Sequence, residues 1–363
     1  MFHKIPYVDA ERRIIGEHAG FLGRGMVPTY NTPVTPRANF AALFDEKHPY
    51  WMPDGKDNIA VHPMIYNMNL GRGHRADLVD VFGVKWKYEP TSGGSITVGG
   101  NPLLDDVNNW KQVIKIPDID AWDWPAAAEE TPVDAIFPCY ISLVNGFWFE
   151  RLISFMDFMP AAMALIDDDQ TDAVKELFDA TTDLACKLVD KICANWPQID
   201  FIEVHDDWGA QKAPFFSRDV ADELFVPYMK RFTDRVHAWG RHTMLHSCGH
   251  TEERVECYIN AGFEFWTPQP MNDIGALYDQ YGDRMIFGVW PEETDLAERT
   301  EEEQRAAARR FVDRFCQPGK PSVMSVEASR RGTPAFMDEV YIYSRAKYLA
   351  EGARPHPPHI PAG

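Results

Sequence analysis

The chain has 363 residues, 45% of them hydrophobic, which is enough to bury a large core, and α/β barrels of this size commonly form one domain. Its formal net charge of −19 disfavours nucleic acids and anionic membranes as partners, because phosphate binding usually needs a clustered basic face. No run of about 18 apolar residues and no signal-peptide core occur, so no membrane segment is expected. Six cysteines lie scattered along the chain, unlike a disulfide framework, so we expect a cytoplasmic protein.

The chain begins with a stretch, residues 1–60, that is rich in proline, glycine and aromatic residues. We predict an irregular N-terminal arm there, with one short helix near residues 40–44. Residues 87–132 contain two glycine pairs and several prolines, which predict a hairpin and loop insertion. Residues 61–352 are expected to form a single barrel domain, and residues 353–363 a proline-rich tail.

From residue 133 onward, short apolar runs alternate with amphipathic segments in the manner of repeated βα units. The predicted strands are residues 134–143, 199–205, 241–246, 263–266, 285–290 and 322–327. The clearest predicted helices are residues 170–196, 217–239, 300–315 and 334–351. Pro227 should kink the second of these helices, and Thr300 with Glu303 should form a capping box at the start of the third. Six strand–helix repeats, with room for two more before residue 133, predict an α/β fold of the (β/α)₈ TIM-barrel class.

The active site of such a barrel gathers at the carboxyl ends of its strands, so polar residues that close the predicted strands are candidates for the site. These residues are Tyr140, Glu203, His205, Asp206, Asp207, His246, Cys248, Gln269, Trp290 and Glu327. Acids, imidazoles and a thiol at one rim are what a metal site or an acid–base site requires.

The pair His246 and Cys248 is the sharpest candidate. Residues two positions apart in an extended chain project to the same side, so an imidazole and a thiolate can reach one zinc ion, and Gly249 lets the backbone turn directly afterwards. The other interpretation is a core-facing histidine near a buried thiol. As third ligand we prefer Glu327, because zinc accepts a carboxylate. Cys316 is the alternative, but it ends a predicted helix and is expected at the opposite face.

Residues 203–207 crowd three carboxylates around His205. Close carboxylates resist joint ionisation, so Asp206 or Asp207 could hold a proton near neutral pH and act as an acid together with His205, or the group could bind a cation. A cluster that caps a helix through hydrogen bonds is the competing interpretation.

Several further residues are predicted to contact substrate: Tyr140, Trp208, His250, Gln269, Trp290 and Asp80. The aromatic members could sandwich an aromatic ring, or could serve only in packing. His250 is equally consistent with an exposed residue at a helix start, and Asp80 with a solvated helix face.

The sequence around His205 and around the His246–Cys248 pair resembles the uroporphyrinogen decarboxylase superfamily. The resemblance lies in residues 205–211, 225–231 and 246–249, and order and spacing agree from about residue 35 to 350. It implies a (β/α)₈ barrel. The superfamily contains decarboxylases, which grip their substrate with an arginine-rich N-terminal motif that is absent here, and zinc-dependent methyltransferases that carry a His-x-Cys pair, matched by His246 and Cys248. The distant cysteine of the methyltransferases corresponds to Glu327, a departure from the family pattern.

The form of residues 205–209 is most similar to the subgroup associated with corrinoid-dependent demethylation of methoxylated compounds. The resemblance therefore implies O-demethylation of an aryl methyl ether, with zinc held by His246, Cys248 and Glu327 and a corrinoid (cobalamin), carried by a partner protein, as methyl acceptor. The expected partners are a small-molecule methyl donor and that corrinoid protein, and a homodimer is left open. The alternative is a metal-free decarboxylase that uses Asp77 or Asp80.

Overall fold

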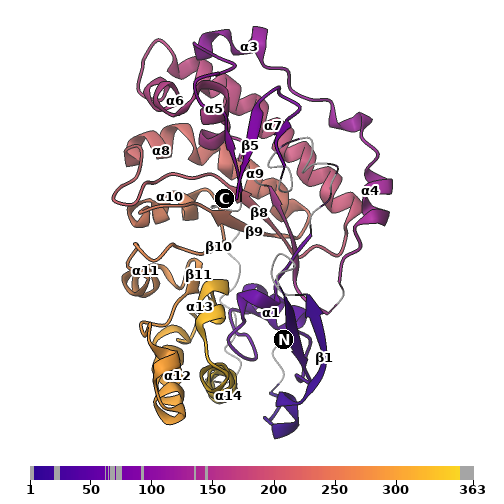
Figure 1. Ribbon diagram of the computed structural model, residues 1–363, viewed down its shortest axis with the longest axis vertical. Helices are drawn as coiled ribbons and strands as arrows, with labels where there is room; N and C mark the ends of the chain where they lie inside the picture. Colours follow the sequence, from indigo (N-terminus) through magenta and orange to yellow (C-terminus); the bar gives the residue numbers. More distant parts are fainter. Residues whose placement is uncertain are drawn as a thin grey trace, which may run out of the picture. The chain divides into compact units, whose positions relative to one another are not determined.

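The computed structural model (Figure 1) describes residues 4–351, apart from 20–24, 62, 64, 66–69, 71–75, 91–93, 135 and 144–145. The chain folds into two compact units. The first unit comprises residues 1–59, 134–138 and 274–363, and the second comprises residues 60–133 and 139–273. The domain limits expected from the sequence stay a prediction, and the expected tail at 353–363 lies outside the described residues.

The second unit is built on parallel strands that are buried. β7 (Cys139–Leu143) pairs with β8 (Phe201–His205), β8 with β9 (His242–His246), and β9 with β10 (Phe265–Trp266), all in parallel; the short β3 (Ile59–Val61) neighbours β7. β7 is buried along its whole length and β8 at every residue but the last, as expected for strands covered on both faces, although Ser142, Glu203 and His205 are polar.

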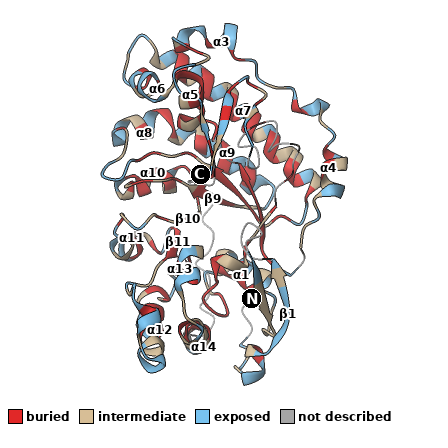
Figure 2. Ribbon diagram, viewed as in Figure 1, coloured by how far each residue is buried: buried red, intermediate tan, exposed pale blue. Residues whose placement is uncertain are grey.

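Helices follow these strands as the sequence predicts. α7 (Thr171–Asn195) buries one face (Figure 2) and contacts α9 (Val226–Ala238). The predicted helix at 217–239 is broken at Phe225 into α8 (Arg218–Leu224) and α9, because Pro227 lacks the N–H that a continuous helix would need and stands in the first turn of α9 instead. The shorter helices of this unit are η4 (Val107–Asn109), α3 (Trp110–Val113), η5 (Ile119–Ala121), α4 (Trp124–Glu130), α5 (Phe149–Met156), α6 (Phe158–Ala164), η6 (Glu252–Arg254) and α10 (Val255–Asn260).

The predicted insertion of the second unit is an antiparallel sheet. β4 (Leu78–Val79) pairs with β5 (Lys85–Glu89), and β5 pairs with β6 (Gly94–Thr97). The inward-facing residues Trp86 and Ser95 are buried, whereas Ile96 is half exposed. This alternation is typical of a sheet with one covered face.

The first unit joins the N-terminal arm to the C-terminal quarter of the chain. The arm is more regular than predicted: β1 (Ile14–Ala19) and β2 (Met26–Tyr30) pair in an antiparallel hairpin, followed by α1 (Pro36–Asp45). β11 (Ile286–Val289) pairs in parallel with β12 (Ser322–Met324). The helices of this unit also include η1 (Asp9–Arg12), η3 (Gly55–Asp57), α11 (Ile274–Tyr281), η7 (Leu296–Glu298), α12 (Glu301–Phe315), α13 (Val326–Arg331) and α14 (Pro334–Glu351).

The last predicted strand needs a correction. β12 ends at Met324, and Ser325 then caps α13, its hydroxyl accepting the N–H of Ala328. Glu327 therefore lies in the first turn of a helix and not at the end of a strand, because the capping serine had been counted as strand. The capping box of Thr300 and Glu303 is present as predicted.

The α/β class, with parallel strands and intervening helices, is confirmed. The described residues do not show a closed barrel of eight strands. None of the described helices combines the length and the apolar character that crossing a bilayer would need.

Candidate functional site

Two histidines end neighbouring strands in the second unit. His205 is the last residue of β8 and His246 the last of β9, and the two are partners in the parallel register. Their rings stack with centroids 4.3 Å apart and an angle of 24° between the planes. The pairing follows directly from parallel register, because partners on adjacent strands present their side chains to the same face.

The turns after these strands are held together by two glycines. Gly249 has a φ of +93°, and a Cβ atom there would lie 2.2 Å from the backbone of Gly209. A side chain on Gly209 would in turn meet Thr251 at 2.6 Å. The backbone N–H of His250 donates to the carbonyl of Ala210 at 2.8 Å. Glycine is therefore required at both positions for the loop after β8 to meet the loop after β9.

This close approach brings Asp207 against the His-x-Cys pair. Asp207 Oδ1 accepts the backbone N–H of Cys248 at 2.7 Å and lies 3.9 Å from His246 Nε2. The Cys248 Sγ lies 3.2 Å from the same Nε2. Gln269 contacts the same turn. Its amide nitrogen lies 3.4 Å from Cys248 Sγ, and its oxygen accepts the N–H of Gly249 at 2.7 Å.

These donors fit a zinc ion. The donor atoms of Asp207, His246 and Cys248 all lie within 4.8 Å of one another, and neighbouring ligands of a tetrahedral zinc ion are separated by roughly 3 to 4 Å. The donor set of one carboxylate, one imidazole and one thiolate is one that zinc accepts. The side chains of His246 and Asp207 keep 35% and 29% of their accessible surface, so a fourth position could be reached by a ligand.

His246 belongs to a second possible metal-binding group, with Glu203 and His205. His205 Nε2 lies 3.2 Å from Glu203 Oε2 and 3.0 Å from Ser142 Oγ. Burial opposes ionisation of Glu203, but the interactions with His205, His246 and Ser142 outweigh burial and lower its pKa. Glu203 is thus held as a carboxylate, and it orients the His205 ring that stacks on His246.

The adjacent carboxylate, Asp206, faces elsewhere. It is fully buried and accepts the backbone N–H groups of Glu150 at 3.0 Å and Phe149 at 3.3 Å, and the indole N–H of Trp208 at 2.8 Å. Burial, and then the charge of Glu150, raise the pKa of Asp206 well above its ordinary value, although these hydrogen bonds oppose the rise. For Asp206 the geometry matches the helix-capping interpretation, here at the start of α5.

Three predicted substrate contacts occupy buried positions. Trp208 has no exposed surface and packs against Phe216, Phe225 and Tyr258. Tyr140 is the second residue of β7 and stacks on Phe201, the first residue of β8, at 4.7 Å. It therefore lies at the amino end of its strand and not at the carboxyl end, because the strand begins later than predicted.

Asp80, the third of these, is likewise engaged within the fold, and not on a solvated helix. It forms an ion pair with Arg151 at 2.9 Å and accepts the indole N–H of Trp86 at 3.0 Å. Its other oxygen accepts the N–H groups of Phe82 and Val84. Asp80 thus organises the turn into β5 and connects it to α5.

The remaining predicted residues differ in setting. His250 is partly exposed, and its pKa is raised by a hydrogen bond to Glu252 and by one to the carbonyl of Lys212. Glu327 and Trp290 belong to the first unit: Glu327 pairs with Arg330 and its side chain is half exposed, and the guanidinium of Arg331 lies over the Trp290 ring at 5.9 Å. Neither of the two possible metal-binding groups among the described residues contains Glu327.

A cavity of about 270 Å³ adjoins Asp207 in the second unit. Its walls come from the β5–β6 hairpin, from α5, from the first residue of α6, and from the loop that follows β8. They consist of Trp86, Ser95, Ile96, Thr97, Glu150, Ile153, Phe158, Asp207, Gly209 and Phe215. The hairpin residues could not be predicted from the sequence, because they belong to an insertion and no spacing pattern connects them to the strand ends.

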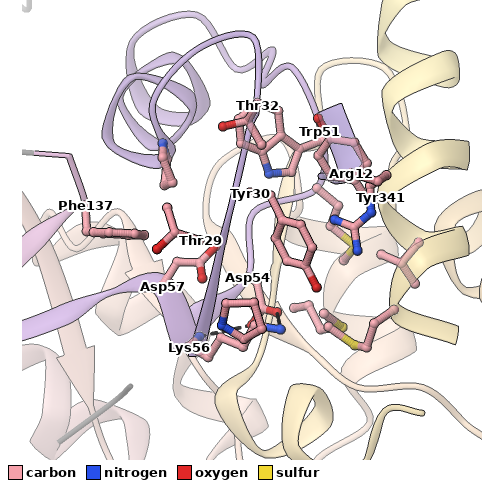
Figure 3. Close-up of a pocket in the computed structure, with 16 residues that line it drawn as sticks. Arg12, Thr29, Tyr30, Thr32, Trp51, Asp54, Lys56, Asp57, Phe137 and Tyr341 are labelled. Carbon is pink, nitrogen blue, oxygen red and sulfur yellow. Dashed lines mark hydrogen bonds and ion pairs between the residues drawn. The ribbon is translucent and has the colours of Figure 1, made fainter. Parts of the chain in front are cut away.

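The first unit contains a smaller cavity, of about 80 Å³ (Figure 3). Its charged residues are engaged by other groups: Lys56 Nζ lies 2.8 Å from Asp54, and the guanidinium of Arg12 lies over the Tyr30 ring at 3.9 Å and binds Asp338. Asp57 Oδ1 lies 3.8 Å from His18 Nε2, and burial, followed by the charge of Asp54, raises the pKa of Asp57 to about 7.

Comparisons with known proteins give a likeness in fold. No family model and no curated protein matches the sequence. Solved structures do match, among them a methyltransferase from Methanosarcina mazei with a TM-score of 0.51 and 14% sequence identity, covering 87% of this chain and 86% of that chain. At this identity the likeness shows the fold alone.

Proposed function

We propose that this chain is a zinc- and corrinoid-dependent methyltransferase that removes the methyl group of an aryl methyl ether. The observation that carries the proposal is the position of Asp207: it belongs to the group with His246 and Cys248 and also lines the adjoining cavity. A methyl donor in that cavity would lie beside the metal ligands. The structural likeness to a methyltransferase supports this assignment.

The chemistry needs activation of a poor leaving group. The bond from the methyl carbon to oxygen breaks, its electron pair stays on the oxygen, and the methyl group passes to the reduced cobalt of a corrinoid carried by a partner protein. Zinc bound to Asp207, His246 and Cys248 would supply a Lewis acid for the developing negative charge. Glu327, the third ligand predicted from the sequence, is the alternative to Asp207.

The surrounding residues have defined tasks in this proposal. Gln269 donates to the sulfur of Cys248 and tempers its charge, while its oxygen holds the turn at Gly249. His205, held by Glu203 and Ser142 and stacked on His246, orients that imidazole and can carry a proton for the departing oxygen. The decarboxylase alternative uses Asp77 or Asp80. Asp80 is engaged with Arg151 and Trp86, Asp77 Oδ1 accepts the backbone N–H of Tyr88 at 2.8 Å, and neither is among the described residues that line the cavity.

Metal content and methyl transfer test the proposal together. We expect purified wild-type protein to contain zinc by elemental analysis, and to methylate a reduced corrinoid protein when 2-methoxyphenol is added, followed by the cobalt absorbance. His246→Ala and Cys248→Ala should lose the metal, and the transfer rate should fall about 100-fold or more. Wild-type protein without zinc, together with unchanged activity of His246→Ala, would overturn the mechanism.

A pair of variants identifies the third ligand. Asp207→Ala should reduce zinc content, whereas Glu327→Gln, which removes a half-exposed carboxylate paired with Arg330, should retain it. The reverse result would assign the position to Glu327. His250→Ala is the matched control, because this histidine lies in the same turn but outside both metal-binding groups.

A further inference from the structure

The cavity beside Asp207 has a composition that defines its ligand. Three aromatic rings, Trp86, Phe158 and Phe215, contribute to its walls together with Ile96 and Ile153. The rings of Phe158 and Phe215 lie 4.9 Å apart in an edge-to-face arrangement. Apolar and aromatic walls with a few polar groups are typical of a site for a small flat ligand.

One polar group in this wall lacks a partner. Ser95 has 3% of its surface exposed, and its hydroxyl makes no hydrogen bond to any other described residue. Leaving a hydroxyl buried without a partner is unfavourable, and native proteins rarely do so. Because Ser95 lines the cavity, a ligand substituent can supply the missing partner.

The charge of the walls restricts the ligand further. Two carboxylates, Glu150 and Asp207, line the cavity, and the described lining residues include no lysine or arginine. With Asp207 bound to the metal, an anionic substituent elsewhere on the ligand would meet the charge of Glu150, and no cationic side chain of the described wall would offset it, so a neutral ligand is favoured.

We infer that Ser95 determines specificity for a neutral methoxyarene that carries a second hydrogen-bonding oxygen, of which 2-methoxyphenol is the simplest example. The inference rests on the proposed function for its assignment of the cavity to the methyl donor. The second oxygen of the ligand forms a hydrogen bond with the Ser95 hydroxyl, and the ring lies among Trp86, Phe158 and Phe215. The methoxy group points toward Asp207 and the other metal ligands.

Equilibrium binding tests the inference without methyl transfer. Titration calorimetry would compare 2-methoxyphenol, methoxybenzene and 4-hydroxy-3-methoxybenzoate on the full-length protein. We expect wild type to bind 2-methoxyphenol about tenfold more tightly than methoxybenzene, as one hydrogen bond to a buried group provides. 4-Hydroxy-3-methoxybenzoate, which carries a carboxylate, should bind more weakly than 2-methoxyphenol. Glu150→Gln removes one of the like charges, so it should reduce the difference in affinity between these two ligands.

The variant Ser95→Ala should bind 2-methoxyphenol and methoxybenzene equally. Its melting temperature should equal or exceed that of wild type, since it removes an unsatisfied hydroxyl. Ser154→Ala is the matched control: this buried hydroxyl donates to the carbonyl of Arg151 at 2.7 Å, so its loss should lower the melting temperature and leave the ligand preference unchanged.

The two proposals fail in different ways. Equal affinity of wild type for the phenol and for methoxybenzene, or a preference that persists in Ser95→Ala, would overturn the role of Ser95 even if methyl transfer occurs. A Ser95-dependent preference without any methyl transfer to the corrinoid protein would support the binding site and count against the proposed function.

Discussion

Each unit contains a charged cluster, and the two clusters differ in burial. In the first unit, Arg345, with no exposed surface, lies 3.2 Å from Glu11 and donates to the carbonyl of Ile5. At the strand ends of the second unit, Asp207 and His246 stay partly exposed and 3.9 Å apart, next to a thiol.

Burial and hydrogen bonding distinguish a structural cluster from a reactive one. A buried ion pair between distant segments holds those segments together, and removing one partner is expected to destabilise the fold, because the other charge stays buried. A group of unlike donors at a partly exposed rim contributes little to packing but can share a ligand. The following variants test this distinction.

The largest effect on stability is expected from Arg345→Met. It leaves Glu11, which also accepts the Tyr341 hydroxyl at 2.6 Å, buried without its cation. The free energy of unfolding in urea should fall by about 3 to 5 kcal/mol. Lys175→Met, which removes an exposed pair with Glu223, should lower it by less than about 1 kcal/mol. Similar losses in both variants would contradict the contrast between buried and exposed pairs.

Adjacent aspartates in the second unit should behave differently. Asp206→Ala leaves the Trp208 indole and two backbone N–H groups of α5 without an acceptor, so unfolding should become easier by roughly 3 kcal/mol. Asp207→Ala should change the unfolding free energy of metal-free protein by less than about 1 kcal/mol. Chemical denaturation of both variants after zinc removal measures this. If both lose the same stability, Asp207 is a structural residue and the metal site is in doubt.

A smaller, pH-dependent effect is expected at Asp57 in the first unit. Its pKa is raised from 3.8 to about 7 by burial and by Asp54, so the folded protein binds a proton there that the unfolded chain releases. The stability from that proton is complete below the ordinary pKa and is lost as the pH rises through about 7.

Asp57→Asn has no charge to bury. It should therefore match wild type near about pH 4 and exceed it by on the order of 2 kcal/mol near about pH 8. Urea unfolding at several pH values measures the difference. A variant that is less stable than wild type at the higher pH would show that the ionised carboxylate stabilises the fold.

The sequence predicted local structure well where the signal is local. The apolar runs that became β8 and β9 and the capping box of Thr300 and Glu303 depend on neighbours within a few residues, as does the interruption at Pro227, which was predicted as a kink and is a break. Element ends were less certain, since Ser325 reads as strand until its hydroxyl is seen to cap α13. Tyr140 lies near the amino end of β7 because the strand begins at Cys139, later than predicted.

The candidate site shows the same division. The sequence predicts that His246 and Cys248 project together at the end of a strand and that Gly249 turns the chain, because these features depend on two-residue periodicity and on the freedom of glycine. The packing of distant segments sets which of two adjacent aspartates contacts the pair, and it brings Ser95 of the hairpin to the same cavity as Asp207. Those contacts join segments distant in sequence, and their geometry is set by how strands, hairpin and α5 pack.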